Sequence, residues 1–389
     1  MNNNQEKEQL VSEENLTTET LYYDDIRHYR DDEVPGAIEG IINNDSIINS
    51  VTKYIFRKYP SWLVKLCFPI LKGILKSKLR KVKTIHDVQV YVAAFMNGII
   101  KKQTDGFIHT GFDKLDPKKG YLFISNHRDI SLDPAFLNMA LFGNNIDTVK
   151  IAIGDNLLKM PEATDLMKLN KSFIVKRSLT NVKDKIKAFS KLSQYIGLAI
   201  KENKNVWIAQ REGRAKDGND ATEEAILKMF YMYGKKQGLS FKDYIKSLNI
   251  IPVSITYEYD PGDEAKAKEL YEKEHNGSYV KGEMEDIKSI VDGILGYKGR
   301  VHFAAGDPLT GDYENAKELA HAIDKFIYEH YEIFPSTLLA AGITDGVTAE
   351  QKEFFEKRIA NMKPEYRDYA LRMYAAPYIN QQKSLKNEI

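Results

Sequence analysis

The alternation of short apolar runs with amphipathic segments predicts an α/β fold for the middle of this chain. From about residue 107 to 309, apolar runs of strand length alternate with longer segments of helical periodicity. The runs that predict strands are 121–124, 149–153, 173–175, 206–209, 250–256 and 301–303, and helical segments between them include 133–141, 182–202 and 221–234. This order is typical of a mostly parallel central sheet flanked by helices.

The flanking regions have a different pattern. Residues 1–20 are polar and acidic without periodic apolar positions, which predicts a disordered tail. Residues 21–103 have helical periodicity, and Pro35, Pro60 and Pro69 are expected to interrupt the helices. After residue 311 the helical pattern returns, with 366–374 placed ahead of Pro377. We therefore predict a tail (1–20), a helical, basic amphipathic region (21–103), an α/β domain (104–310) and a helical C-terminal region (311–389).

Composition excludes several classes of protein. The 56 lysines and arginines nearly balance the 55 aspartates and glutamates, so there is no global basic field for nucleic acid. The single cysteine, Cys67, excludes an internal disulfide framework and suits a reducing cytoplasm. No apolar stretch reaches the length of about 18 residues needed to span a bilayer. The polar start of the chain also leads us to expect no signal peptide.

One segment departs from this balance of charge. Residues 53–83 contain ten lysines and arginines and no acid, with aromatic and aliphatic residues interleaved. This combination predicts a segment that lies in the headgroup region of an anionic membrane. The side chains expected at that surface are Trp62, Lys65, Phe68, Lys72 and Lys76. A core helix with a solvated basic face is the alternative, whereas single-stranded nucleic acid is disfavoured because no nucleic-acid motif accompanies the charge.

A cluster of candidate catalytic residues follows the predicted strand 121–124. His127, Asp129 and Asp133 lie where a sheet presents reactive groups to substrate. A neutral histidine can take a proton from a substrate hydroxyl while a carboxylate fixes its tautomer, and both aspartates are candidates for that carboxylate. The string His-Arg-Asp also begins the catalytic loop of protein kinases, but that motif requires an asparagine where this chain has Pro134.

Three more clusters lie at or near the ends of predicted strands. Lys176 and Arg177 follow strand 173–175, and two adjacent cations there can hold a phosphate. The loop 210–218 has two glycines, two arginines and a lysine, as in an anion-binding turn. Pro252 lacks a ladder donor and is expected to shape a pocket wall. Neither a Gly-x-Ser-x-Gly nucleophile elbow nor zinc-ligand spacing around His127 is present.

In this order the four clusters resemble the motifs of the glycerol-3-phosphate and 1-acylglycerol-3-phosphate acyltransferase superfamily. The matching strings are Asn126-His127…Asp133, Phe173…Arg177, Glu212-Gly213…Arg214 and Ile251-Pro252. Residues 251–259 and the turn 306–309 are most similar to the bacterial glycerol-3-phosphate branch. Two spacings differ from the family by one residue, between His127 and Asp133 and between Gly213 and Arg214, so Asp129 remains a candidate for the carboxylate.

The resemblance implies transfer of a fatty acyl group from acyl-CoA or acyl carrier protein to the hydroxyl of glycerol-3-phosphate. His127 would be the general base, with Asp133 or Asp129 orienting it, and no metal or cofactor would be needed. The residues expected at the substrate phosphate are Lys176, Arg177, Arg211, Glu212, Gly213 and Arg214, with Asn126 and Pro252 at the pocket wall. The protein would lie in the cytoplasm, peripheral on the inner face of the membrane.

Three other functions remain open from the sequence. Acylation of 1-acylglycerol-3-phosphate would use the same chemistry on a different acceptor. A non-catalytic lipid-binding protein of the membrane surface would keep the fold without turnover. A hydrolase would use the same histidine to activate water.

Overall fold

The computed structural model describes residues 22–45, 49, 60–158, 161–282 and 285–388. The predicted tail, residues 1–20, and part of the basic segment, residues 53–59, lie outside the described residues. The chain divides into two units, one drawn from Met1–Ala93 and Lys150–Tyr195 and the other from Ala94–Val149 and Ile196–Ile389. Two of the divisions fall within helices α5 (Ile85–Gln103) and α8 (Val182–Lys201), and the other falls between Val149 and Lys150.

The second unit is built on a mixed sheet in which parallel pairs dominate. Its strands are β1 (Gly106–Thr110), β2 (Leu122–Ser125), β5 (Val206–Ala209), β6 (Ile250–Tyr257) and β7 (Arg300–Ala305), in the order β1-β7-β6-β2-β5. The pairs β1/β7, β2/β6 and β2/β5 are parallel, and β6/β7 is antiparallel. β2 and β6 are buried along their whole length, as expected for strands covered on both faces.

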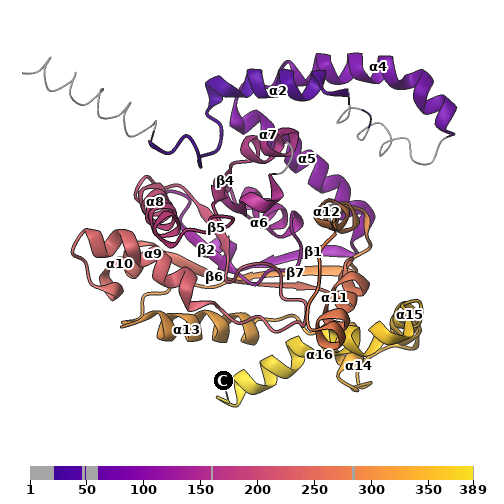
Figure 1. The fold of residues 1–389 in the computed structure, drawn as a ribbon. Helices are drawn as coiled ribbons and strands as arrows, with labels where there is room; N and C mark the ends of the chain where they lie inside the picture. Colours follow the sequence, from indigo (N-terminus) through magenta and orange to yellow (C-terminus); the bar gives the residue numbers. More distant parts are fainter. Residues whose placement is uncertain (1–21, 46–48, 50–59, 159–160, 283–284, 389) are drawn as a thin grey trace, which may run out of the picture. The chain divides into compact units, whose positions relative to one another are not determined.

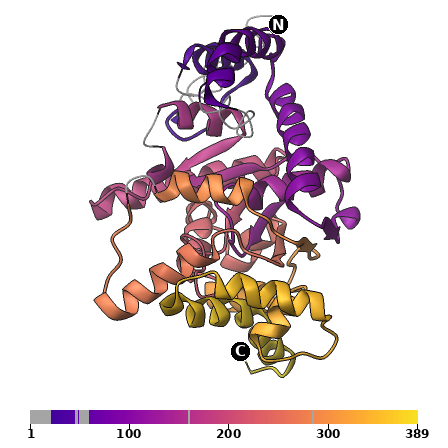
Figure 2. The same ribbon diagram turned by 90° about the vertical axis from the view of Figure 1, so that its right-hand side faces the viewer.

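Helices cover both faces of this sheet. Figure 1 shows α6 and α12 on one face and α13 on the other, and Figure 2 shows the C-terminal helices side by side with α11. The helices of this unit are α6 (Leu132–Gly143), α9 (Glu224–Lys236), α10 (Phe241–Ser247), α11 (Asp263–Asn276), α12 (Glu285–Leu295), α13 (Ala316–Glu329), α14 (Pro335–Ala340), α15 (Ala349–Ala360) and α16 (Pro364–Leu385), with a 3-10 turn, η2 (Phe112–Lys114).

The first unit combines helices with a parallel pair of strands. β3 (Lys150–Gly154) pairs with β4 (Ser172–Val175). Its helices are η1 (Asp31–Glu33), α2 (Val34–Asn43), α4 (Ser61–Leu79), η3 (Asp155–Leu157) and α7 (Pro161–Leu169). A small core forms where the apolar face of α2, including Ile38 and Ile42, meets Val82, Ile85 and Leu169.

An aromatic cluster fixes the helix that follows β2 in the second unit. Phe136 of α6 is fully buried, with ring centroids 4.9 Å from Phe107 of β1 and 5.9 Å from both Tyr257 of β6 and Phe303 of β7. Burying an aromatic ring of this size contributes roughly 2–3 kcal/mol. The start of α6 is therefore held at the carboxyl end of β2, where the candidate site lies.

The predicted α/β fold with mostly parallel strands and flanking helices is confirmed, and all six predicted strands are present. β1 was not predicted, because it lies at an edge of the sheet and is half exposed, so its apolar pattern is weak. The interruption expected at Pro69 is wrong, since α4 runs through it, and α16 likewise continues past Pro377. A proline removes only one backbone donor, and packing can compensate for that loss.

Candidate active site

The loop that carries His127 begins with a buried asparagine that extends the pairing of β2. The Asn126 side chain accepts from the backbone N–H of Ile255 in β6 at 2.8 Å and donates to the carbonyl of the same residue at 2.9 Å. These two bonds replace the ladder bonds that a further strand residue would make. The backbone at His127 is thereby held at the end of β2, between β5 and β6.

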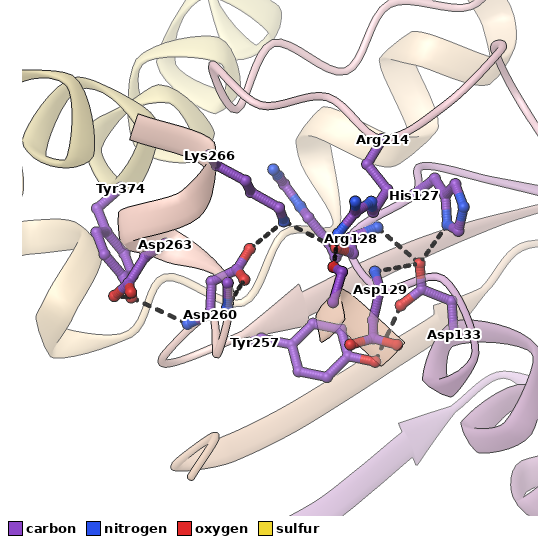
Figure 3. Close-up of polar contacts among 12 residues, drawn as sticks. His127, Arg128, Asp129, Asp133, Arg214, Tyr257, Asp260, Asp263, Lys266 and Tyr374 are labelled. Carbon is purple, nitrogen blue, oxygen red and sulfur yellow. Dashed lines mark hydrogen bonds and ion pairs between the residues drawn. The ribbon is translucent and has the colours of Figure 1, made fainter. Parts of the chain in front are cut away.

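His127 and Asp133 form a hydrogen-bonded pair at this strand end. The Nδ1 atom of His127 lies 2.7 Å from Oδ2 of Asp133, and their side chains are 13% and 0% exposed. An ionised carboxylate only accepts hydrogen bonds, so Nδ1 carries the proton and Nε2 carries the lone pair. Figure 3 shows the imidazole with its other edge turned away from Asp133. This arrangement can act as a general base.

Asp133 is fixed by three further donors. Its Oδ2 accepts from the backbone N–H groups of Arg128 at 2.6 Å and Asp129 at 3.0 Å, and its Oδ1 accepts from the Tyr257 hydroxyl at 2.9 Å. Burial and the Asp133 charge raise the pKa of Tyr257 well above its ordinary value, so that hydroxyl keeps its proton and donates. The carboxylate is also in the first turn of α6, where the helix dipole favours negative charge.

Asp129, the other candidate carboxylate, has a different environment. Its Oδ1 accepts from the backbone N–H groups of Ser131 at 3.0 Å and Leu132 at 2.8 Å, so it satisfies donors at the start of α6. Burial and the neighbouring Asp133 raise its pKa above the ordinary value. Of the two aspartates that the sequence left open, only Asp133 contacts the imidazole in the described residues.

Arg128 lies next to His127 in the chain but faces a buried carboxylate. Its guanidinium is 2.5 Å from Asp220, which also accepts from the Tyr331 hydroxyl at 2.6 Å and from the Asn126 amide at 3.2 Å. Asp220 and Tyr331 were not predicted from the sequence, because neither lies in a motif or a periodic pattern. This buried network ties the His127 loop to the segments after β5 and α13.

The predicted anion-binding loop after β5 places one arginine near the histidine. Figure 3 shows Arg214 reaching toward the His127 loop, and its positive charge opposes the rise in the pKa of Asp129. Arg214 donates to the Ser289 hydroxyl of α12 at 2.7 Å. Arg211 bonds within the loop, to the Asn219 carbonyl at 3.5 Å. Gly213 has a φ of 73°, which a residue with a side chain rarely adopts.

The other predicted site residues lie in different surroundings. Lys176 forms an ion pair with Asp25, and the backbone N–H of Arg177 donates to Asp155 at 3.1 Å, both within the first unit. Pro252 lies inside β6 in register with Ile124. Further along β6, the backbone of Ile255 contacts the Asn126 side chain, and the Tyr257 hydroxyl contacts Asp133. The backbone N–H of Glu212 donates to Glu223 at 3.2 Å.

The basic segment forms helix α4 over the part that the structure describes. Lys65 is exposed, Phe68 is half-buried, Lys72 pairs with Asp45 and Lys76 lies 3.3 Å from Glu39 of α2. Ile70 and Ile74 of this helix are 65% and 49% exposed. Within the described residues no helix has the length and apolar character required to cross a membrane. No cluster of three or more potential metal ligands occurs among the same residues.

The fold and the site together define an α/β domain with an aspartate-bound histidine at the end of a central strand. Residues 107–256 match the family model described as Acyltransferase. No curated protein matches the chain. Among solved structures it is similar to the crystal structure of the 1-acyl-sn-glycerophosphate (LPA) acyltransferase, PlsC, from Thermotoga maritima. The identity is 13%, the TM-score is 0.35, and the match covers 82% of this chain and 99% of that chain.

Proposed function

We propose that this chain is an O-acyltransferase that moves a fatty acyl group from a thioester to the hydroxyl of a glycerol phosphate acceptor, with His127 as general base. The observation that carries this proposal is the 2.7 Å contact between His127 Nδ1 and Asp133, within the segment that matches the acyltransferase family. The pair leaves Nε2 as the basic atom of the ring. A base held in this way can activate a substrate hydroxyl.

The reaction follows from the position of that lone pair. His127 Nε2 takes the proton of the acceptor hydroxyl, and the oxygen attacks the thioester carbonyl. The C–S bond then breaks, and the imidazolium returns its proton to the departing thiolate, so the products are an ester and a free thiol. Asp133 stabilises the imidazolium while the tetrahedral intermediate exists. General-base help of this kind contributes roughly 10²–10⁴ in rate, and positioning of the two substrates supplies much of the rest.

Glycerol-3-phosphate is the acceptor that we propose first, and 1-acylglycerol-3-phosphate is the second candidate. The preference comes from the resemblance of residues 251–259 and 306–309 to the glycerol-3-phosphate branch. Arg214 supports a phosphate-bearing acceptor of either kind, because it is the predicted phosphate ligand that reaches toward the His127 loop in Figure 3. The acyl donor is proposed to be acyl-CoA or acyl carrier protein.

The acceptor is tested by incubating the purified chain with labelled acyl-CoA, or labelled acyl carrier protein, and each acceptor in turn. Thin-layer separation of the lipid products then distinguishes the candidates. We expect acylated glycerol phosphate from glycerol-3-phosphate. Product only from 1-acylglycerol-3-phosphate would select the second acceptor, and free fatty acid without acceptor dependence would indicate a hydrolase. No product with any donor, together with binding to lipid vesicles, would indicate the non-catalytic lipid-binding protein.

Replacing Arg214 by alanine is expected to raise the KM for the acceptor about tenfold or more, with a smaller change for the donor. A hydrogen bond to a charged group contributes about 1.5–3 kcal/mol, which corresponds to roughly 10–100-fold in affinity. Initial-rate kinetics with each substrate varied in turn measure the two constants. The control is Lys228→Ala, which removes an exposed cation of α9 that pairs along its own helix with Glu224. An unchanged acceptor KM in Arg214→Ala would contradict phosphate binding at this residue.

We further propose that α4 rests on the anionic inner face of the membrane. Its exposed Lys65, Ile70 and Ile74 combine positive charge with apolar surface, as such contacts require. Replacing Ile70 and Ile74 together by serine is expected to reduce co-sedimentation with vesicles that contain anionic lipid. Val182→Ser, at an exposed apolar residue of α8, is the control. Equal sedimentation of all three proteins would show that α4 is not the contact.

A further inference from the structure

A buried lysine outside the matched segment contacts the loop that holds the catalytic pair. Lys266 lies in the first turns of α11, and its side chain is 3% exposed. Its Nζ donates to the backbone carbonyl of Arg128 at 2.8 Å and also bonds the Asp260 carboxylate. Burying an ammonium group is costly unless it is paired, and Asp260 supplies that pairing. The second bond, to the main chain of the His127 loop, is not required for charge balance.

The peptide group that joins Arg128 and Asp129 connects Lys266 to Asp133. The carbonyl of this peptide accepts from Lys266, and its N–H donates to Oδ2 of Asp133 at 3.0 Å. The same Oδ2 accepts from His127 Nδ1. A cation at the oxygen end of a peptide polarises it and strengthens the N–H as a donor, because hydrogen bonds in series reinforce one another. Figure 3 shows this series of contacts from Lys266 to His127.

We propose that Lys266 is a positioning residue for acyl transfer: through the peptide between Arg128 and Asp129 it holds Asp133 against His127, and its charge favours the neutral imidazole. The inference rests on the proposed function and deepens it. It assigns a role in the site to α11, which lies beyond residue 256, where the family match ends.

The lysine is itself held by the C-terminal helices. The Tyr374 hydroxyl of α16 accepts from the backbone N–H of Asp260 at 2.9 Å and donates to Asp263 at 2.8 Å. Arg358 of α15 donates to the Asp260 carbonyl at 2.7 Å and contacts Asp263 at 2.6 Å. Asp260 is therefore held by two contacts, one from α15 and one from α16, and the same two side chains hold the nearby Asp263. A preorganised support of this kind is what a positioning group requires.

Several charged or titratable groups face the same region, and they determine how its pH dependence is interpreted. They are Arg128, Asp129, Asp133, Arg214, Asp220, Tyr257, Asp260, Asp263, Lys298, Tyr331, Arg358 and Tyr374. Burial lowers the pKa of Lys298 to about 8, and its ammonium bonds the Gly296 carbonyl. The Arg128 guanidinium is paired with Asp220. Among the described residues Lys266 is the cation whose side chain bonds the main chain of the His127 loop.

Replacing Lys266 by methionine is expected to move the acidic limb of the kcat/KM pH profile to higher pH by about half a unit or more. The sign follows from charge: removing a nearby cation makes protonated imidazole more favourable, so the neutral base appears only at higher pH. We also expect kcat to fall about tenfold with little change in either KM, because the loss affects orientation rather than binding.

Two matched variants separate charge from packing. Lys266→Arg keeps the cation and should retain the wild-type limb. Lys268→Met removes an exposed lysine of the same helix, 3.6 Å from Glu272, and should leave both the limb and kcat unchanged. A Lys266→Met enzyme with lowered kcat but an unshifted limb would show that the lysine only supports the fold, and the proposal would be overturned.

The test remains decisive if Lys266→Met fails to fold or if the chain has another activity. In Lys266→Met/Asp260→Asn both charges of the buried pair are removed, so no unpaired carboxylate is left. The limb should still move upward, because Lys266 bonds the loop directly, but by less, because the negative charge of Asp260 is removed as well. Coincidence with wild type would overturn the proposal. Titration of the His127 ring by NMR reads the same shift without turnover, and this separates failure here from failure of the proposed acyl transfer.

Discussion

Replacing His127 by alanine is expected to lower kcat for acyl transfer by about 10²–10⁴-fold, with the fold retained. The imidazole is the group whose free lone pair can accept the acceptor proton, so its loss removes general-base help completely. The fold should survive because Asp133 keeps three other donors, from Arg128, Asp129 and Tyr257, and is not left unsatisfied. Steady-state kinetics and a thermal melt of the same preparation measure both parts of this expectation.

The matched control for this variant is His321→Ala. His321 is exposed on α13, so its replacement should change neither kcat nor the melting temperature. Full turnover by purified His127→Ala would refute the assignment of the base. A large fall in melting temperature would instead show that the imidazole supports the loop, and His127→Gln, which keeps a donor of similar size near Asp133, would then be the variant to measure.

The central strands could be predicted from the sequence because buried strands leave a strong local signal. β2, β5 and β6 are apolar at nearly every position, and such runs are bounded by polar segments at both ends. His127 is predictable for the same reason, since it follows β2 closely. β1 escapes prediction because an edge strand needs no continuous apolar run. Pro69 and Pro377 were misleading because tertiary packing outweighs the local preference of a proline.

The partners of the site were much harder to predict than its position. The choice between Asp129 and Asp133 depends on how the loop turns into α6, and two carboxylates four residues apart look equivalent in the sequence. Asp220 and Lys266 reach the His127 loop from 92 and 138 residues away in the chain, counted from Arg128. Such contacts leave no periodic pattern. They become visible only when the sheet order and the C-terminal helices are known.

Asparagine at position 133 is expected to lower kcat by about 10²–10⁴-fold, whereas asparagine at position 129 should change it less than about threefold. In Asp133→Asn the amide oxygen can still face His127, Arg128 and Asp129, but the negative charge that stabilises the imidazolium is gone. In Asp129→Asn the amide oxygen can still accept from the start of α6, because asparagine caps helices as well as aspartate does. Parallel kinetics of the two variants test the assignment.

A double-variant cycle makes this comparison independent of the absolute rates. If Asp133 acts only by orienting and stabilising the imidazole, it has no function once the imidazole is absent. His127→Ala/Asp133→Asn should therefore be no slower than His127→Ala alone, whereas independent sites would multiply their losses. Small and similar losses from Asp133→Asn and Asp129→Asn would mean that neither carboxylate orients the histidine. Multiplying losses in the double variant would mean that Asp133 contributes to catalysis by a route other than its contact with Nδ1.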